Sequence, residues 1–228
     1  MNALPTVYLA RMDVDPAMLL DFMTWYTHQH GPDLIAAGFY SVQGYQCRAG
    51  EPYILNVYEI PGSDIFYSEE YTRRRTPEHD RQRPAILAGV SNRSNTPYEQ
   101  VATLGVELPA RPWADGDRTG RIDATTVTTL GLAAPESADD AVLAWFRQGW
   151  ASALAGSGFL RARLCRRAGR PHPARVSTQP RWLVLVEWPD LASAADAEPV
   201  ELAAVAAAEV PFTEVAYNRA VRVLDLRN

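Results

Sequence analysis

The chain has 228 residues, of which 47% are hydrophobic and 21% are charged, and its 22 basic and 27 acidic side chains give a formal net charge of −5. This is the composition of a globular protein, and its acidic balance gives no electrostatic reason to expect nucleic acid or an anionic membrane surface as a partner. Because no apolar run is long enough to span a membrane and the N-terminus lacks a basic segment followed by an apolar one, we expect a cytoplasmic protein.

The N-terminal half predicts strands and helices in the order β-α-β-β-α-β. A strand over 6–12 precedes Asp15 and Pro16, which are typical of a helix N-cap and a first helical position. This helix should run to His30, break at Gly31 and Pro32, and resume briefly through residue 37. The unit is completed by strands over 40–48 and 53–60, a helix over 63–75, irregular chain over 76–95 with a short helix near 84–88, and a strand over 98–106.

The C-terminal half repeats this order. Strands are predicted over 124–130, 160–167, 182–188 and 216–224, and helices over 137–154 and 191–208, the second interrupted at Pro199. The landmarks Trp25-Tyr26, Gly38-Phe39, Arg48-Ala49-Gly50 and Glu59-Ile60-Pro61 recur in order as Trp145-Phe146, Gly158-Phe159, Arg167-Ala168-Gly169 and Glu187-Trp188-Pro189. A supersecondary unit used twice is therefore predicted. We place the units at 1–107 and 122–228, with a Pro- and Gly-rich linker over 108–121 and with the second unit structural.

The predicted element order is that of a ferredoxin-like unit, in which both helices cover one face of a four-stranded antiparallel sheet. The bare face of each sheet must be covered. We therefore predict an α+β protein in which the antiparallel sheets of two tandem units pack into a pseudo-dimeric α/β barrel. Such a chain can be a monomer or form a homodimer. The two cysteines, Cys47 and Cys165, are expected to be small, partly buried thiols.

The pattern Trp25-Tyr26-x-x-Gln29-His30-x-Pro32, followed by Gly38-Phe39 and a tyrosine-bearing strand, resembles the EthD-like branch of the dimeric α/β-barrel superfamily. The resemblance implies paired ferredoxin-like units, here fused in tandem, with small ligands bound between sheet and helices. It also implies a functional role for His30, which stands where the family's motif histidine stands. Members of the superfamily include cofactor-independent isomerases, polyketide cyclases, quinone-forming monooxygenases and haem-binding peroxidases, so the fold does not determine the reaction.

Helical spacing places Phe22, Tyr26 and His30 on one apolar stripe of the first helix. An imidazole at the end of such a stripe can act as a general acid or base near neutral pH, with Tyr26 assisting, or it can simply meet the helix C-terminus. We predict the catalytic role, because the second half has lost this histidine. His28 and Asp33 are secondary candidates. His28 diverges from His30 on a helix, and Asp33 is the nearest acid, so we expect no metal and no haem or other cofactor.

Further side chains can bind the substrate of such a site. An inward Arg11 can hold a carboxylate or enolate, or it can be an ordinary surface residue. The side chains of Tyr45 and Tyr58 on the strands, and of Tyr67 and Tyr71 on the second helix, can line the same cavity or belong to the core. Glu59 has a counterpart in Glu187, which suggests a shared structural role. The mixed-charge run over 69–83 is expected to be a solvated face or a lid over the cavity. His172 is expected to lie in an exposed loop.

These observations favour a cofactor-independent enzyme that uses general acid/base catalysis on a small, largely apolar carbonyl or polyketide-like compound. Cyclisation, isomerisation or dehydration in specialised metabolism is the leading hypothesis. The alternatives are a cofactor-independent, quinone-forming monooxygenase and a non-catalytic protein that binds small molecules. No lysine is present, which excludes Schiff-base chemistry through lysine.

Overall fold

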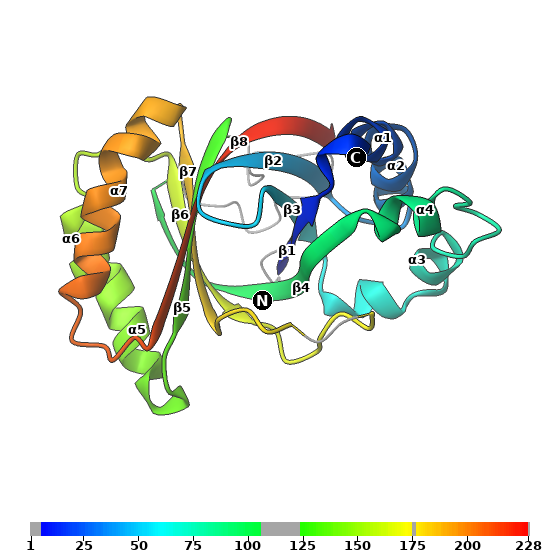
Figure 1. Cartoon of the computed structure of the whole chain (residues 1–228). Coiled ribbons are helices and arrows are strands. Elements are labelled where there is room, and N and C mark those ends of the chain that lie inside the picture. The colour runs from blue at the N-terminus through cyan, green and yellow to red at the C-terminus, as the bar shows by residue number, and fades with distance from the viewer. Residues whose placement is uncertain (1–5, 106–123, 175–176, 228) are drawn as a thin grey trace.

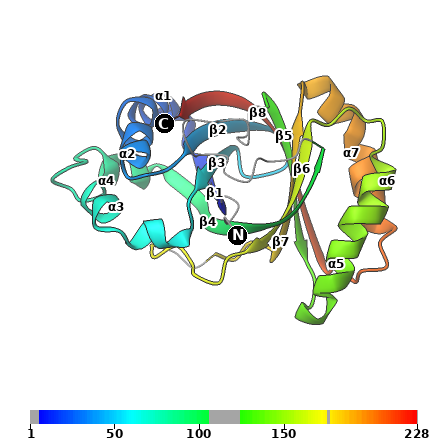
Figure 2. The same cartoon turned by 180° about the vertical axis from the view of Figure 1, so that it is seen from behind.

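The computed structural model describes residues 6–105, 124–174 and 177–227. Eight strands form one closed antiparallel barrel, and two groups of helices cover its opposite sides (Figures 1 and 2). The strands are β1 (Thr6–Val14), β2 (Ser41–Ala49), β3 (Ile54–Ile60), β4 (Val90–Gly105), β5 (Thr126–Ala133), β6 (Arg161–Arg167), β7 (Trp182–Trp188) and β8 (Glu214–Arg227). The predicted linker over 108–121 falls outside the described residues.

The strand order shows two ferredoxin-like units joined edge to edge. The first half contributes the run β4-β1-β3-β2 and the second half the matching run β8-β5-β7-β6. Antiparallel pairing of β2 with β8 and of β4 with β6 closes the barrel. This arrangement confirms the predicted α+β fold class and the predicted barrel. The barrel closes because the sheet edges of the two units satisfy each other's backbone hydrogen bonds.

The helices of each half lie on the outer face of that half's sheet. In the first half they are the 3-10 helix η1 (Pro16–Met18), α1 (Leu19–Trp25), the π-helix η2 (Tyr26–His30), α2 (Gly31–Ala36), the 3-10 helix η3 (Ser63–Tyr67), α3 (Glu69–Arg73) and α4 (Arg83–Ala88). In the second half they are η5 (Glu136–Ala138), α5 (Asp139–Trp145), the π-helix η6 (Phe146–Trp150), α6 (Ala151–Ala153) and α7 (Leu191–Ala206). No helix in the described part of the chain has the length and apolarity needed to cross a membrane.

The first helical region confirms its predicted start but not its predicted break. Asp15 accepts a hydrogen bond from the backbone N–H of Ala17 at 2.9 Å. The prediction that Gly31 and Pro32 end the helix is wrong. A π turn carries the chain onward, with the Gly31 N–H bonded to the Tyr26 carbonyl, and α2 follows directly. Proline is tolerated there because it occupies the first turn of α2, where its missing N–H costs little.

Three other predicted boundaries are wrong. The helix predicted over 63–75 is split at Ser68, whose extended backbone ends η3 and whose side chain caps α3. The chain predicted to be irregular up to residue 95 already forms β4 from Val90, because it pairs with β1 from Val14 onward. Pro199 does not interrupt α7, which is continuous from Leu191 to Ala206. The pairing and packing that decide these boundaries are tertiary, and local propensity does not record them.

Each strand alternates between the barrel interior and the helices. On β1, Val7 and Leu9 belong to the interior cluster, whereas Tyr8, Ala10 and Met12 pack toward the helices. The interior cluster also contains Cys47 and Cys165, which are free and buried, as expected. The side-chain period of two therefore separates the barrel core from the layer under the helices, and any cavity in that layer is lined by one residue in two.

A buried ion cluster lies in the barrel interior and joins the two halves. The Arg163 guanidinium donates to Glu59 at 2.7 Å and to Glu187 at 3.0 Å, and Arg161 donates to Glu187 at 2.6 Å. Burial alone would lower the pKa of Arg163, but the attraction of Glu187 and Glu59 outweighs it and raises that pKa. Glu59 and Glu187 therefore have the shared structural role that their repetition in the sequence suggests.

Replacing Arg163 by methionine should destabilise the protein by about 3–5 kcal/mol, because it leaves the Glu59 carboxylate buried without the Arg163 guanidinium. Urea unfolding measures this loss. Adding Glu59→Gln to Arg163→Met should restore part of the stability, since the remaining Arg161–Glu187 pair is neutral. Arg73→Met, which removes an exposed pair with Glu70, is the matched control and should leave the midpoint unchanged. A double variant no more stable than Arg163→Met would contradict this account.

Candidate functional site

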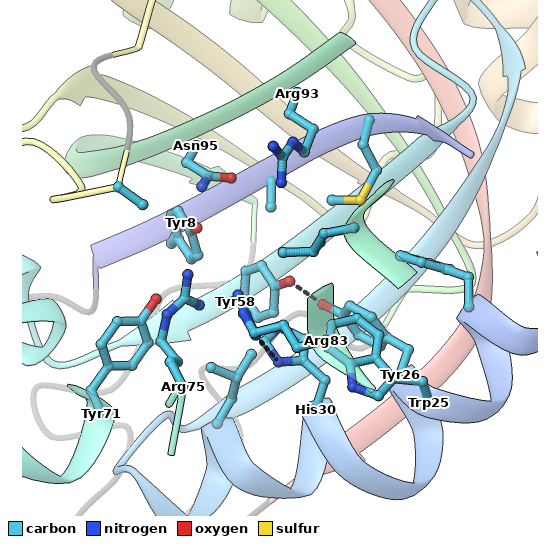
Figure 3. Close-up of a pocket in the computed structure, with 16 residues that line it drawn as sticks. Tyr8, Trp25, Tyr26, His30, Tyr58, Tyr71, Arg75, Arg83, Arg93 and Asn95 are labelled. Atoms are coloured by element: carbon cyan, nitrogen blue, oxygen red, sulfur yellow. Dashed lines mark hydrogen bonds between the residues drawn. The ribbon is translucent and has the colours of Figure 1, made fainter. Parts of the chain in front are cut away.

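A partly enclosed cavity of about 180 Å³ lies between the outer face of the first half's sheet and the helices that cover it. Figure 3 shows its side chains converging from β1, β3, β4 and the helical segments. The lining residues are Tyr8, Ala10, Met12, Phe22, Trp25, Tyr26, His30, Leu34, Tyr58, Tyr71, Arg75, Arg83, Leu87, Arg93, Asn95 and Ala174. An apolar cavity of about 150 Å³ accommodates benzene, so this one can hold a substituted aromatic ring.

Buried phenol groups form the floor of the cavity. Tyr8 of β1 stacks on Tyr58 of β3 with ring centroids 4.9 Å apart. The hydroxyl of Tyr58 is hydrogen-bonded to that of Tyr26, which comes from the π turn above the sheet. Burial raises the pKa of each of these three phenols, so all of them are protonated near neutral pH. The floor is therefore a flat aromatic surface that carries neutral hydroxyl groups.

His30 faces the cavity as a neutral ring. It stacks on Trp25 at 4.5 Å between centroids, and Tyr26 meets its edge at 5.1 Å. Arg83 donates from Nη1 to His30 Nδ1 at 3.3 Å, which leaves the imidazole proton on Nε2. Burial, followed by the charges of Arg83 and Arg75, holds the pKa of His30 well below its usual value. The imidazole is therefore a hydrogen-bond donor through Nε2 in this arrangement.

The cavity is cationic. Arg75, Arg83 and Arg93 line it, and none of the described lining residues is an aspartate or glutamate. The carboxylate of Asp80 lies 3.8 Å from Arg83, and it also accepts hydrogen bonds from Trp25 Nε1. Burial and the repulsion of Arg75 lower the pKa of Arg83 to about 10. Converging cations beside neutral donors favour an anionic ligand, because its charge would relieve their repulsion.

The second half contributes a loop to this cavity. Ala174 lines it, and His172 stacks on Tyr8 with centroids 5.6 Å apart and hydrogen-bonds Tyr71 at 2.8 Å. The expectation that His172 is exposed is wrong, since only 1% of it is accessible. The His172 side chain is buried because it packs against Tyr71 and Phe66 of the other half, whereas its neighbours in the chain are exposed. The sequence gives no local signal of this contact.

The equivalent layer in the second half is filled. Phe146 and Trp150 stand where Tyr26 and His30 stand in the first half, and their rings stack at 5.4 Å. Both are completely buried, together with Trp188, in the core under α5 and α7. Two large apolar side chains thus occupy, in this layer of the second half, the positions at which the first half has Tyr26 and His30 beside its cavity.

The structure brings together five of the predicted site residues and separates the others. Phe22, Tyr26, His30, Tyr58 and Tyr71 line the cavity. Arg11 and Tyr45 do not, because alternation along β1 and β2 turns them into the barrel. There Arg11 donates to Gln179, and the Tyr45 hydroxyl donates to Gln43 at 3.1 Å.

Three more candidates lie outside the cavity. Tyr67 is 41% exposed and donates to the carbonyl of Pro171. His28 is exposed, because it lies two residues before His30 on the helix. Asp33 is buried but accepts hydrogen bonds from Gln29, Arg74 and His79, so it holds the loop after α3 against α2.

Sequence reasoning missed Tyr8, Trp25, Arg75 and Arg83 as lining residues. Tyr8 shares one face of β1 with Ala10 and Met12, and this pattern identifies a cavity residue only once the face that meets the helices is known. Arg75 and Arg83 belong to the mixed-charge run over 69–83, which has no counterpart in the second half, and this difference between the repeats is the signal that could have found them.

Haem does not fit this cavity. Its macrocycle is several times larger than benzene, for which about 150 Å³ suffices. His30 Nδ1 is occupied by Arg83, and both ring nitrogens of His172 are hydrogen-bonded. Among the described residues, no group of three or more histidine, cysteine, aspartate or glutamate side chains could hold a metal ion.

A scan against models of protein families finds no match, and a search of curated proteins finds none with significant similarity. Solved structures do match. A proposed monooxygenase from Fusobacterium nucleatum aligns with 100% of this chain and 96% of its own, at a TM-score of 0.63 and 8% identity. An anthrone oxidase-like protein aligns with 99% of this chain and 93% of its own, at a TM-score of 0.65 and 15% identity.

A haem-binding protein from Thermus thermophilus aligns with 97% of this chain and 92% of its own, at a TM-score of 0.53 and 13% identity. At such low identities these likenesses show the fold alone. Membership of the dimeric α/β-barrel superfamily and of its EthD-like branch stays a prediction.

Two neutral buried imidazoles should make the protein less stable as the pH falls. Burial, with Arg75 and Arg83, lowers the pKa of His172 to about 3, and His30 is shifted in the same direction. Below pH 6.5 the unfolded chain binds protons at these histidines and the folded one does not. The free energy of unfolding should therefore decrease toward pH 5, by up to about 1.4 kcal/mol per pH unit for each histidine.

Urea unfolding between pH 7 and 5 measures this slope. His172→Phe should reduce it, because the phenyl ring cannot take up a proton in either state. His28→Gln, at an exposed position, is the control. A slope that His172→Phe leaves unchanged would contradict this account, because it would show that the imidazole takes up protons equally in the folded and the unfolded protein.

Proposed function

We propose that the protein is a cofactor-independent monooxygenase that binds a small hydroxylated aromatic compound as its phenolate and converts it to a quinone with molecular oxygen. One observation carries the proposal. Three arginines converge on a small aromatic cavity that no described carboxylate lines. Aromatic walls suit a planar ring, and cations suit an anion, so a phenolate satisfies both.

The side chains present can stabilise such an anion. The arginines supply charge, and neutral hydroxyl groups and the Nε2–H of His30 supply hydrogen bonds that do not bring a competing negative charge. Preorganised donors of this kind lower the pKa of a bound phenol. The proton lost on binding passes to water, and the phenolate that remains is a far better electron donor than the phenol.

The proposed reaction consumes one molecule of oxygen for each phenol. The phenolate ring carbon opposite its oxygen forms a bond to oxygen, which is reduced to a peroxide while the ring is oxidised. The peroxide takes up a proton from water, which balances the proton lost on binding, and the O–O bond then breaks. Hydroxide leaves, the ring carbon loses its hydrogen as a proton, and these two form water beside the quinone. The protein's part is to bind and orient the phenolate and to exclude bulk water.

The comparisons support the proposal without deciding it. Two of the similar structures carry the words monooxygenase and anthrone oxidase in their descriptions. Both words name oxidation, which is the class of reaction proposed for this chain. The reaction therefore rests on the cavity of this chain and on its fold.

A second candidate is supported by the contact between Tyr26 and His30. A phenol and an imidazole whose rings meet at 5.1 Å could relay a proton during cyclisation, isomerisation or dehydration of a small carbonyl compound, with an enolate in place of the phenolate. The same arginines would stabilise that enolate. Such a reaction needs no oxygen, which separates the two candidates. A non-catalytic binding protein would show affinity without turnover.

Oxygen uptake by the purified protein, tested with phenols and hydroxynaphthalenes, should match quinone formation one to one. Arg83→Met should lower kcat/KM roughly 100-fold, which is the usual effect of removing one group that stabilises a developing anion. Arg73→Met, on the exposed side of α3, is the matched control and should keep full activity.

Three outcomes would count against the monooxygenase. Turnover that continues without oxygen would favour the proton-transfer enzyme. Tight binding with no turnover of any compound would favour a carrier. Equal activity of Arg83→Met and Arg73→Met would remove the cationic cavity as the site.

A further inference from the structure

Arg170 and Pro171, which follow β6 in the second half, contact the first half. The Tyr67 hydroxyl donates to the Pro171 carbonyl at 2.7 Å. The Arg170 guanidinium lies 3.6 Å above the Tyr67 ring and pairs with Asp64. These contacts immediately precede His172, whose ring lies against Tyr8 and Tyr71, two residues that line the cavity.

Hydrogen bonds determine which nitrogen of His172 carries the proton. The backbone N–H of Ala174 donates to His172 Nδ1 at 3.1 Å, so Nδ1 is an acceptor. A neutral imidazole has one acceptor and one donor, and the proton is therefore on Nε2. Nε2 lies 2.8 Å from the Tyr71 hydroxyl oxygen, to which it must donate.

Tyr71 then has a single remaining way to use its hydroxyl group. Its oxygen accepts from His172, and the Arg75 guanidinium carbon lies 4.8 Å from its ring centroid. A phenol hydroxyl that accepts from His172 cannot also donate to it, and a guanidinium accepts no hydrogen bond, so the Tyr71 proton is directed elsewhere. Tyr71 lines the cavity, and Figure 3 shows its hydroxyl oxygen beside the Arg75 guanidinium, which also lines it.

We infer that His172 is a positioning residue that the second half contributes to the site of the first. By donating to Tyr71, it turns the Tyr71 hydroxyl proton toward the cavity, where this hydroxyl becomes a hydrogen-bond donor to a bound oxyanion. The inference deepens the proposed function and rests on it for the identity of the anion. It also assigns a role to the second half, which the sequence predicted to be only structural.

A purely structural role for His172 makes a different prediction. Its ring stacks parallel to Tyr8 and packs against the edge of Phe66 at 4.8 Å. If packing were its only role, His172→Phe would preserve it, because phenylalanine keeps the aromatic ring. If positioning is its role, His172→Phe loses the donor to Tyr71, and His172→Gln restores it through the side-chain amide.

Nitrogen-15 NMR of the full chain tests the hydrogen bond without any ligand. We expect a neutral His172 with its proton on Nε2, and a change in the Nε2 chemical shift in Tyr71→Phe. A proton on Nδ1, or a shift unaffected by Tyr71→Phe, would overturn the inference.

The probe for the oxyanion is 4-nitrophenol, whose phenolate is identified by its absorption. Binding should lower its pKa, and His172→Phe should weaken phenolate binding roughly 10-fold, the usual effect of one hydrogen bond to a charged group. His172→Gln should recover most of the affinity. If His172 acts through Tyr71, the double variant Tyr71→Phe/His172→Phe should bind no more weakly than Tyr71→Phe.

The two proposals fail in different ways. Losses that add in the double variant, or His172→Phe with wild-type affinity, would overturn the positioning role while leaving the phenolate site intact. A wild-type protein that binds no nitrophenolate would contradict the proposed function, and the NMR result would then decide whether His172 orients Tyr71.

Discussion

Closure of the barrel is the constraint on which the rest of the structure depends. Each ferredoxin-like sheet has two edges, and the chain satisfies them by pairing β2 with β8 and β4 with β6. The strand β4 has two roles, since its first residues pair with β1 and carry Arg93 and Asn95 into the cavity, and its last residues hold β6. The loop that follows β6 is thereby brought over a site in the other half. The ion cluster around Arg163 secures the same junction from inside the barrel.

Burial has opposite effects on the acids and the bases of the cavity, and both effects favour an anionic guest. It raises the pKa of Tyr8 and Tyr58 and lowers those of His30 and Arg83. The phenols and imidazoles stay neutral and can donate hydrogen bonds, whereas the arginines stay charged and none of the described lining residues is a carboxylate. An anionic ligand would be attracted by these arginines, and a cationic one would be repelled.

The two halves share the same unit, but one of them has a cavity where the other has a filled core. Both contain a π turn at the same place, η2 in the first half and η6 in the second. In the second half, the turn presents Phe146 and Trp150 to a filled core. In the first half, it presents Tyr26 and His30 to an open space. A filled core stabilises the fold, whereas a cavity loses packing contacts. The packed core of the second half therefore helps to offset the loss of stability that the cavity causes in the first half.

The sequence by itself determined the order of the elements, the repeat, the alternation of faces along each strand and the stripe that carries Phe22, Tyr26 and His30. These features are local, because periods of two and of about four residues follow from strand and helix geometry. Tertiary structure alone decided which strand face meets the helices, and so it placed Tyr8 in the cavity and Arg11 in the barrel. It also decided the contact of Tyr71 with His172, which lies 101 positions away along the chain. Such contacts depend on how sheets close and loops fold back, and no local pattern in a single sequence encodes them.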